Sequence, residues 1–432
     1  MAENKISTQP YKGSRDFYPE DMRLRNYIFG IWKKVCERFG YEEYDGPFIE
    51  PFEIYEAKTG DEIVNQQLYS FIDRGERKVA IRPEMTPTLA RMVAQKFYEL
   101  PQPIRWYSIP NLWRYEKPQR GRLREHYQLN VDIFGVDSVE ADFELFLILI
   151  NIMQEFGAKE NMFEIKINHR ELAENIYTDL GIHKKDFSEL NKAIDKKYKL
   201  SEDDFEKMLK EDVKLNNGQI NNIKNFFKNP YPAMQKMKTS GAAAIRHLLK
   251  LCDDSEISKF VKYDPTIIRG LDYYTGTVFE LFDLNPNNIR AMSGGGRYDD
   301  LVSMFLNKKI SATGFGMGDV TFTNFLQDWK LIPELKNSCE YLITLWPSQE
   351  RDFYDRGMEL SQKLREMGKN AEMWLDSDTK IDKQLKYADK KGINNVIIIG
   401  ENELKNNEAT VKNLETREQK TLPLKKFLTD LK

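Results

Sequence analysis

The chain contains 432 residues, 41 % hydrophobic and 31 % charged, a mixture that excludes a wholly disordered protein and predicts roughly two to four domains. Its 65 Lys and Arg residues are balanced by 68 Asp and Glu, which excludes a basic surface over the whole molecule. The three cysteines are widely separated and the four histidines lack metal-ligand spacing, so we expect neither disulfides nor a structural metal site.

Helical and strand patterns alternate along the first three quarters of the chain. Apolar residues at helical spacing predict a helix over 21–39, and short β-rich pieces follow as far as residue 81. Strands flank a loop rich in Pro, Gly and Arg between about 103 and 136, and a later helix carries the apolar run FELFLILINIM. Residues 171–253 are charge-dense and helical in pattern, and they interrupt strand-type sequence that resumes at 265–320.

The last part of the chain has a different pattern. After a linker near 329–338, the short strands YLITLWP, AEMWLD and NNVIIIG are separated by charged helices, which predicts an α/β domain over 338–432. We therefore expect an α+β protein whose main domain comprises 1–170 and 254–332 and carries a helical insertion over 171–253. The apolar run is too short to cross a bilayer and the N-terminus has no apolar leader, so we expect a soluble, cytoplasmic protein without a membrane partner.

Segment 113–135, WRYEKPQRGRLREHYQLNVDIFG, is the most informative stretch. Residues in its second half alternate strictly, which in a strand places them on two opposite faces. The apolar face carries Tyr127, Leu129, Val131 and Ile133, and the polar face carries His126, Gln128, Asn130 and Asp132. The loop before them holds Lys117, Arg120, Arg122 and Arg124, whose guanidinium groups suit bidentate capture of phosphate oxygens. The alternative is a merely exposed basic hairpin.

Three further segments combine glycine or proline with polar residues. Segment 267–283, IIRGLDYYTGTVFELFD, carries Arg269 and two adjacent tyrosines, of which a regular strand would direct only one toward a site. In 292–301, MSGGGRYDDL, three glycines permit close approach of the backbone to a ligand. In 81–91, IRPEMTPTLAR, prolines stiffen the backbone around Glu84. The alternatives are a core strand with aromatic packing and a tight turn.

Taken together and in this order, these segments resemble those of the histidyl-tRNA synthetases, which are class II aminoacyl-tRNA synthetases. The predicted helix over 21–39 with GYEEYDGPFIEP is similar to motif 1, and the hairpin at 113–135 is similar to motif 2. RGLDYYTG and SGGGRYDD are similar to the signatures peculiar to the histidine enzymes. The resemblance covers nearly the whole chain and implies an antiparallel-sheet catalytic domain with a helical insertion and a C-terminal anticodon-binding domain.

The family resemblance also implies an activity and partners. Members activate L-histidine with ATP and Mg²⁺, release pyrophosphate and transfer the histidyl group to the 3′-terminal adenosine of histidine tRNA. They form symmetric homodimers through motif 1. The alternative is a non-catalytic paralogue such as the regulatory subunit of ATP phosphoribosyltransferase, which usually lacks the anticodon-binding domain and has a degraded histidine signature.

Site residues follow from the resemblance position by position. Arg114 and Arg269 are implied as the catalytic arginines that contact the reacting phosphate, and Arg114 is also implied to contact the carboxylate region of histidine. ATP-binding roles are implied for Arg114, Glu116, Arg122 and His126, the last where the family usually has phenylalanine. Contacts with the amino group and backbone of histidine are implied for Glu84, Met85, Thr86 and Gln128. Recognition of the imidazole is implied for Asp132, where glutamate is common, and Tyr274, with Tyr273 and Tyr298 close by.

The C-terminal half differs from the family pattern at one position and contains a lysine cluster with two interpretations. The resemblance leads us to expect an arginine that clamps ATP after the glycine strand GFGMG, but Asp319, Val320 and Thr321 follow, with Thr321 at the matching position. We expect Arg297 to assist ATP binding instead. In the C-terminal domain, Lys383, Lys386, Lys390 and Lys391 form either a patch for tRNA phosphates or a solvated helix face.

Overall fold

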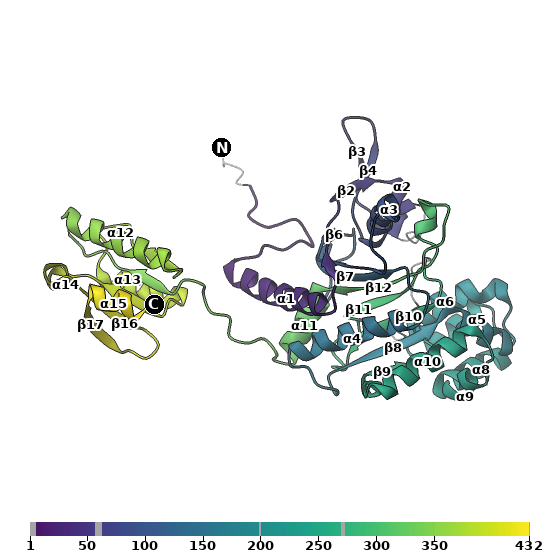
Figure 1. The fold of residues 1–432 in the computed structure, drawn as a ribbon. Coiled ribbons are helices and arrows are strands. Elements are labelled where there is room, and N and C mark those ends of the chain that lie inside the picture. Colours follow the sequence, from purple (N-terminus) through teal and green to yellow (C-terminus); the bar gives the residue numbers. More distant parts are fainter. Residues whose placement is uncertain (1–5, 57–62, 198–199, 269–272, 349, 432) are drawn as a thin grey trace, which may run out of the picture. The chain divides into compact units, whose positions relative to one another are not determined.

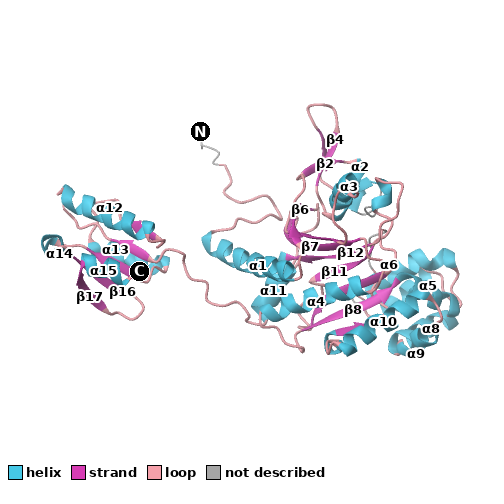
Figure 2. Ribbon diagram, in the orientation of Figure 1, coloured by secondary structure: helices cyan, strands magenta, loops and turns pink. Residues whose placement is uncertain are grey.

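The computed structural model describes residues 6–56, 63–197, 200–268, 273–348 and 350–431. The chain divides into two compact units, Met1–Ile332 and Pro333–Lys432. Each unit contains its own sheet and its own hydrophobic core, and helices and strands are mixed in both (Figure 1, Figure 2). No helix within these described ranges is long and apolar enough to span a bilayer.

The first unit is built on a large, mostly antiparallel sheet. Its strands run in the order β1-β5-β7-β12-β11-β10-β8-β9, with β6 paired to β7, and only the outer pairs β1-β5 and β8-β9 are parallel. Their bounds are β1 (Glu42–Glu43), β5 (Ile104–Ser108), β6 (Asn111–Trp113), β7 (Glu125–Phe134), β8 (Phe163–His169), β9 (Val261–Tyr263), β10 (Thr277–Asp283), β11 (Ser293–Arg297) and β12 (Ala312–Gly318). The predicted antiparallel α+β architecture is confirmed.

Helices pack against both faces of this sheet. The larger core joins Leu129, Val131 and Phe279 of the strands to apolar side chains of several helices. These include α1 (Pro19–Arg38), α4 (Glu140–Glu155), α10 (Ser240–Asp254) and α11 (Asp319–Asp328). A smaller core places α3 (Thr86–Lys96) against Phe134 and Val278. Since residues 129 and 131 enter the larger core, the predicted alternation of β7 is confirmed.

Two peripheral groups of elements complete the first unit. A small sheet, ordered β2-β4-β3, precedes α3 together with a short helix. Its elements are β2 (Ile49–Pro51), α2 (Glu53–Glu56), β3 (Ser70–Ile72) and β4 (Lys78–Ile81).

The segment predicted as an insertion is helical throughout its regular elements. Four of its helices share a core of their own that includes Tyr177, Leu190 and Ile223, whereas α10 packs on the large sheet. The elements before α10 are α5 (Arg170–Asp179), α6 (Phe187–Lys196), α7 (Glu202–Glu211), α8 (Asn217–Lys228) and α9 (Tyr231–Lys236). A separate domain with boundaries at 171 and 253 stays a prediction.

The second unit is an α/β domain, as predicted. Its sheet has the order β14-β13-β15-β16-β17, parallel around β13 and antiparallel beyond β15. The strands are β13 (Tyr341–Ile343), β14 (Ala371–Met373), β15 (Asn395–Ile398), β16 (Glu408–Asn413) and β17 (Gln419–Pro423). The helices are α12 (Arg351–Glu366), α13 (Ile381–Lys391), α14 (Glu401–Asn406) and α15 (Leu424–Asp430).

Candidate active site

Two adjoining cavities lie on the polar face of the central strands of the first unit. The larger has a volume of about 400 Å³ and the smaller about 40 Å³. Both are lined by Arg114, Gln128, Gly294 and Gly316. Gln128, Gly294 and Gly316 lie on the neighbouring strands β7, β11 and β12, and together with Arg114 they form a common wall. A molecule in one cavity therefore borders a molecule in the other.

A buried carboxylate dominates the smaller cavity. Asp132 on β7 is 3 % exposed, and its Oδ1 accepts a hydrogen bond from the Tyr298 hydroxyl at 2.5 Å. Its Oδ2 is buried and has no hydrogen-bond partner among the described residues. Burial raises the pKa of Asp132 to about 7, although the hydrogen bond from Tyr298 acts in the opposite direction. Oδ2 is therefore free to accept an N–H from a bound ligand.

Glycine at position 314 makes room for that carboxylate. Gly314 on β12 lies opposite Asp132 in the register of the two strands. A Cβ atom at this position would lie 1.9 Å from Asp132 Oδ1, far inside the van der Waals distance. The glycine-rich strand thus allows close approach of two strands at the floor of the cavity.

Glu84 lies across the same cavity. Its side chain is 3 % exposed, and its Oε2 accepts a hydrogen bond from the Tyr273 hydroxyl at 3.1 Å. Thr86, the first residue of α3, also faces the cavity. The structure brings together the predicted histidine-contacting residues Glu84, Thr86, Gln128, Asp132, Tyr273, Tyr274 and Tyr298. Both adjacent tyrosines, rather than one, line the cavity, because they lie in the turn before β10 and not in a regular strand.

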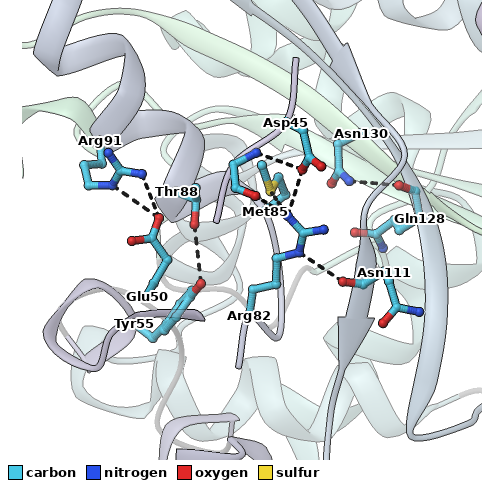
Figure 3. A network of polar contacts seen from close by, with 11 residues as sticks. Asp45, Glu50, Tyr55, Arg82, Met85, Thr88, Arg91, Asn111, Gln128 and Asn130 are labelled. Carbon is cyan, nitrogen blue, oxygen red and sulfur yellow. Dashed lines mark hydrogen bonds and ion pairs between the residues drawn. The ribbon is translucent and has the colours of Figure 1, made fainter. Parts of the chain in front are cut away.

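Met85 is the predicted histidine contact that does not line the cavity. Its fully buried side chain packs beside Arg82, with the sulfur 3.9 Å from Nη1. Arg82 in turn donates to the Asn111 carbonyl at 3.0 Å and to Asp45 at 2.8 Å (Figure 3). Arg82 was not predicted as a site residue, since an arginine before a proline forms no recognisable pattern. This network fixes the backbone turn that presents Glu84.

The larger cavity contains four of the predicted nucleotide contacts, Arg114, Glu116, Arg122 and His126. Arg122 and Glu116 form an ion pair, with Nη2 and Oε1 separated by 2.6 Å. Arg114 donates from Nε to the Pro83 carbonyl at 2.8 Å. Desolvation of the His126 imidazole, followed by the nearby charges of Arg114, Arg15 and Arg122, lowers its pKa to about 3. The ring is therefore neutral at physiological pH and suited to stacking on a flat base.

Arg297 does not reach either cavity. Its guanidinium donates to the buried Asp142 at 3.0 Å and to the carbonyls of Val136 at 2.8 Å and Ser138 at 2.9 Å. These bonds tie β11 to the start of α4. The expectation that Arg297 contacts ATP is therefore corrected: the N–H donors of Arg297 bond to groups inside the protein, and Arg297 lines neither cavity. The sequence carried no sign of a partner 155 positions away.

Residues 319 to 321 have separate roles in the structure. Asp319 is 4 % exposed and accepts hydrogen bonds from Arg15 at 2.8 Å and from the Tyr127 backbone N–H at 2.9 Å. Thr321 lines the larger cavity. A Cβ atom at Gly121, in the motif 2 loop, would lie 3.2 Å from Thr321 Cγ2 and 3.4 Å from Arg290 Cδ. The loop tip, Thr321 and Arg290 thus meet at one edge of the cavity.

Some lining residues had no predicted role, and one predicted residue cannot be placed. Arg290, Asp195 and Glu280 line the larger cavity, from the β10–β11 loop, α6 and β10 respectively. A basic residue shortly before the glycine run was the available signal for Arg290, whereas nothing marked Asp195. Arg269 lies outside the described residues, so its catalytic role stays a prediction.

Comparisons with known proteins agree over the whole chain. Residues 13–319 match the family model described as histidyl-tRNA synthetase, and residues 342–432 match that of an anticodon binding domain. The histidine–tRNA ligase of Leptospira biflexa is 44 % identical, covering 100 % of this chain and 99 % of that protein. The histidine–tRNA ligase of Pyrococcus furiosus is 36 % identical, with coverages of 94 % and 95 %.

Solved structures show the same fold. The histidyl-tRNA synthetase of Nostoc sp. PCC 7120 has a TM-score of 0.81 at 22 % identity, covering 99 % of both chains. A Bacillus halodurans protein titled ATP phosphoribosyltransferase regulatory subunit/histidyl-tRNA synthetase has a TM-score of 0.74 at 23 % identity. The match covers 91 % of this chain and 98 % of the Bacillus halodurans chain.

Proposed function

Because the chain belongs to the histidyl-tRNA synthetase family and is a histidine–tRNA ligase, we propose that the smaller cavity binds histidine and the larger one binds ATP. The observation that carries this assignment is the buried Oδ2 of Asp132, which has no hydrogen-bond partner among the described residues and lies next to a cavity lined by arginines. The anticodon-domain match over 342–432 favours the ligase over the regulatory paralogue, since the paralogue usually lacks this domain.

Recognition of histidine rests on buried hydrogen-bonding groups. Asp132 accepts an N–H of the imidazole through Oδ2, while Tyr298 holds the carboxylate in place. Tyr274 lies against the ring, and Glu84, oriented by Tyr273, binds the α-amino group together with Thr86 and Gln128. An apolar amino acid of similar size would leave these polar groups unpaired in a buried site, which is a strong basis for rejection.

Arg114 is the described residue to which we assign the chemical step. It belongs to the wall shared by both cavities, where the histidine carboxylate meets the α-phosphate of ATP. A carboxylate oxygen attacks the α-phosphorus, and the bond from that phosphorus to the oxygen bridging to the β-phosphate breaks. Pyrophosphate leaves with the electron pair. Arg114 stabilises the charge that develops on the non-bridging oxygens, and we assign the same task to Arg269, which lies outside the described residues.

The remaining nucleotide contacts follow from charge and shape. The neutral His126 ring stacks on adenine, and Glu116 lies near the base. Arg122, held by Glu116, contacts the outer phosphates. The histidyl-adenylate formed in this way then transfers its acyl group to the 3′-terminal adenosine of the tRNA.

Magnesium fits this cavity as a companion of ATP rather than as a resident ion. Glu116, Asp195 and Glu280 supply carboxylates to the lining, the ligand type that Mg²⁺ prefers. Within the described ranges, however, no three His, Cys, Asp or Glu side chains are grouped closely enough to hold a metal. Phosphate oxygens would therefore provide most of the ligands, and the bound ion would neutralise charge on the departing pyrophosphate.

The second unit would bind tRNA through α13. Lys383, Lys386 and Lys390 are exposed and follow helical spacing on one face, whereas Lys391 bonds to Glu372 and Tyr387. We expect Lys386→Ala to weaken tRNA binding and to reduce the slope of log affinity against log salt by about 1. Lys391→Ala is the matched control and should change that slope less. Equal slopes for Lys386→Ala and the wild type would rule out this surface.

A symmetric homodimer and a cytoplasmic location complete the proposal. On or beside the small sheet, whose strand β2 forms the end of the motif 1 segment, four apolar residues expose 41–63 % of their surface: Phe48, Ile49, Phe71 and Ile72. Exposed apolar residues grouped in this way suit a subunit interface.

The three cysteines are free thiols, which suits a reducing compartment.

Histidine-dependent exchange of pyrophosphate into ATP is the direct test. We expect exchange with histidine and none with the other amino acids, tested one at a time in the presence of Mg²⁺. Replacing Asp132 with asparagine should raise the histidine KM while leaving the ATP KM unchanged. Absence of exchange with every amino acid, in protein shown to be folded, would refute activation by this site.

A further inference from the structure

Arg290 is a cavity-lining cation that the assigned roles leave unused. It lies in the loop between β10 and β11 and is partly buried in the wall of the larger cavity. In the described part of the chain, its guanidinium has no hydrogen bond, ion pair or ring contact. The other arginines near the site differ: Arg122 pairs with Glu116, Arg297 with Asp142 and Arg15 with Asp319.

The loop that carries Arg290 is held in place on both sides. Before it, the Asn288 amide donates to Asp283 at 2.6 Å and to Asp328 at 2.8 Å. After it, the Met292 backbone N–H donates to the Leu281 carbonyl at 2.8 Å. An arginine with five N–H donors is thus presented at the cavity edge on an anchored backbone.

The position of Arg290 also coincides with the departure at Thr321. Its Cδ and Thr321 Cγ2 both lie within 3.4 Å of the same point, the Cβ position of Gly121. Arg290 therefore lies beside position 321, where the family resemblance leads us to expect an arginine. Threonine at 321 leaves space there for the Arg290 side chain.

We propose that Arg290 binds the phosphate chain of ATP and provides the positive charge that Thr321 cannot. This inference rests on the proposed function, which places ATP in the larger cavity. The phosphates are the anionic part of the nucleotide, and Arg290, which has no ion pair with any described residue, can bind them without breaking one. Arg122 is already paired with Glu116 and would gain less from the same contact. Arg290 is thus a binding residue for ATP.

Binding of ATP and adenosine to Arg290→Ala provides the test. Hydrogen bonds to charged groups contribute about 1.5–3 kcal/mol, so we expect the ATP Kd to rise about 10- to 100-fold by calorimetric titration. The adenosine Kd should stay within about 2-fold, because adenosine has no phosphate. Arg290→Lys keeps a charge but loses the bidentate fork and should fall between the wild type and the alanine variant.

Matched controls separate this contact from loss of structure and from failure of the proposed function. Arg74, exposed in the turn between β3 and β4, lies outside both cavities, and Arg74→Ala should leave both Kd values unchanged. In the exchange assay, Arg290→Ala should raise the ATP KM and leave the histidine KM and the unfolding temperature unchanged. An unchanged ATP Kd, or equal losses for ATP and adenosine, would overturn the role of Arg290. Lack of histidine-dependent exchange by the wild type would instead refute the proposed function.

Discussion

The two cavities share a wall but differ in how their polar groups are satisfied. In the smaller one, Asp132 and Glu84 are almost completely buried, and each accepts a hydrogen bond from a tyrosine hydroxyl. In the larger one, the charged groups include a partly exposed arginine in an ion pair, Arg122, and a second arginine, Arg290, that has no partner among the residues the structure describes. Burial makes the smaller cavity selective, because an ill-fitting ligand leaves polar groups unpaired. The partly exposed arginines make the larger one a site for anions.

The largest effect should come from the electrostatic penalty of burying Asp132. Its pKa in the folded protein, about 7, lies above the unfolded value near 3.9. The folded state therefore retains a proton that the unfolded state releases between about pH 4 and 7, and wild-type stability falls as pH rises through that range. Asp132→Asn removes this dependence. Its free energy of unfolding relative to the wild type should rise by up to about 4 kcal/mol between these pH values.

Denaturant unfolding at several pH values measures this effect. Comparing Asp132→Asn with the wild type at each pH cancels the contributions of other titrating groups to first order. A difference that stays constant across the range would show that the carboxylate is solvated and that the smaller cavity is not as dry as its geometry indicates.

Arg114→Ala should produce the next largest effect, on the rate. Removing one preorganised donor to a developing oxyanion typically lowers kcat by about 10²–10³. Since Arg114 lines both cavities, the exchange rate should fall while the fold is retained. Steady-state exchange and thermal unfolding measure the two quantities. A variant that loses rate only through a raised histidine KM would place Arg114 in the smaller cavity alone.

Tyr298→Phe should act on histidine alone. The substitution removes the hydroxyl that donates to Asp132 Oδ1 and leaves a buried carboxylate oxygen without its partner. We expect the histidine KM to rise about 10-fold and the ATP KM to stay the same. Michaelis constants from the exchange assay decide the outcome, and parallel increases for both substrates would contradict the separation of the two cavities.

Arg122→Ala should give the smallest effect, on ATP alone. The charge of Arg122 is partly neutralised by its ion pair with Glu116, so loss of Arg122 should raise the ATP KM only about 3-fold. The histidine KM provides the internal control. An increase as large as that expected for Arg290→Ala would show that the ion pair opens when the nucleotide binds.

Local patterns predicted what local geometry determines. The alternation of residues 126–133 identified which side chains face the core and which face the ligand, because a strand has a period of two residues. Similarly, the short apolar strands of the second unit marked its sheet. Family resemblance then supplied roles for residues such as Glu84 and Tyr273, which a single sequence does not relate to each other.

Contacts across long stretches of chain were not predictable in this way. Arg297 was expected at the nucleotide, but its partner Asp142 lies in a different element and no local pattern links them. Asp195 reaches the cavity from the helical segment, and Arg290 reaches it from a loop. In each case the packing of distant elements decides which polar side chain is near the ligand.

The common wall has a consequence for inhibition. A single compound that extends across Arg114 from the smaller cavity into the larger one would combine the contacts of both substrates. Such a compound loses translational and rotational freedom once instead of twice, so its binding free energy can exceed the sum for the separate fragments. A non-hydrolysable mimic of histidyl-adenylate is therefore the natural lead, and its nucleobase end would take its selectivity among class II enzymes from His126.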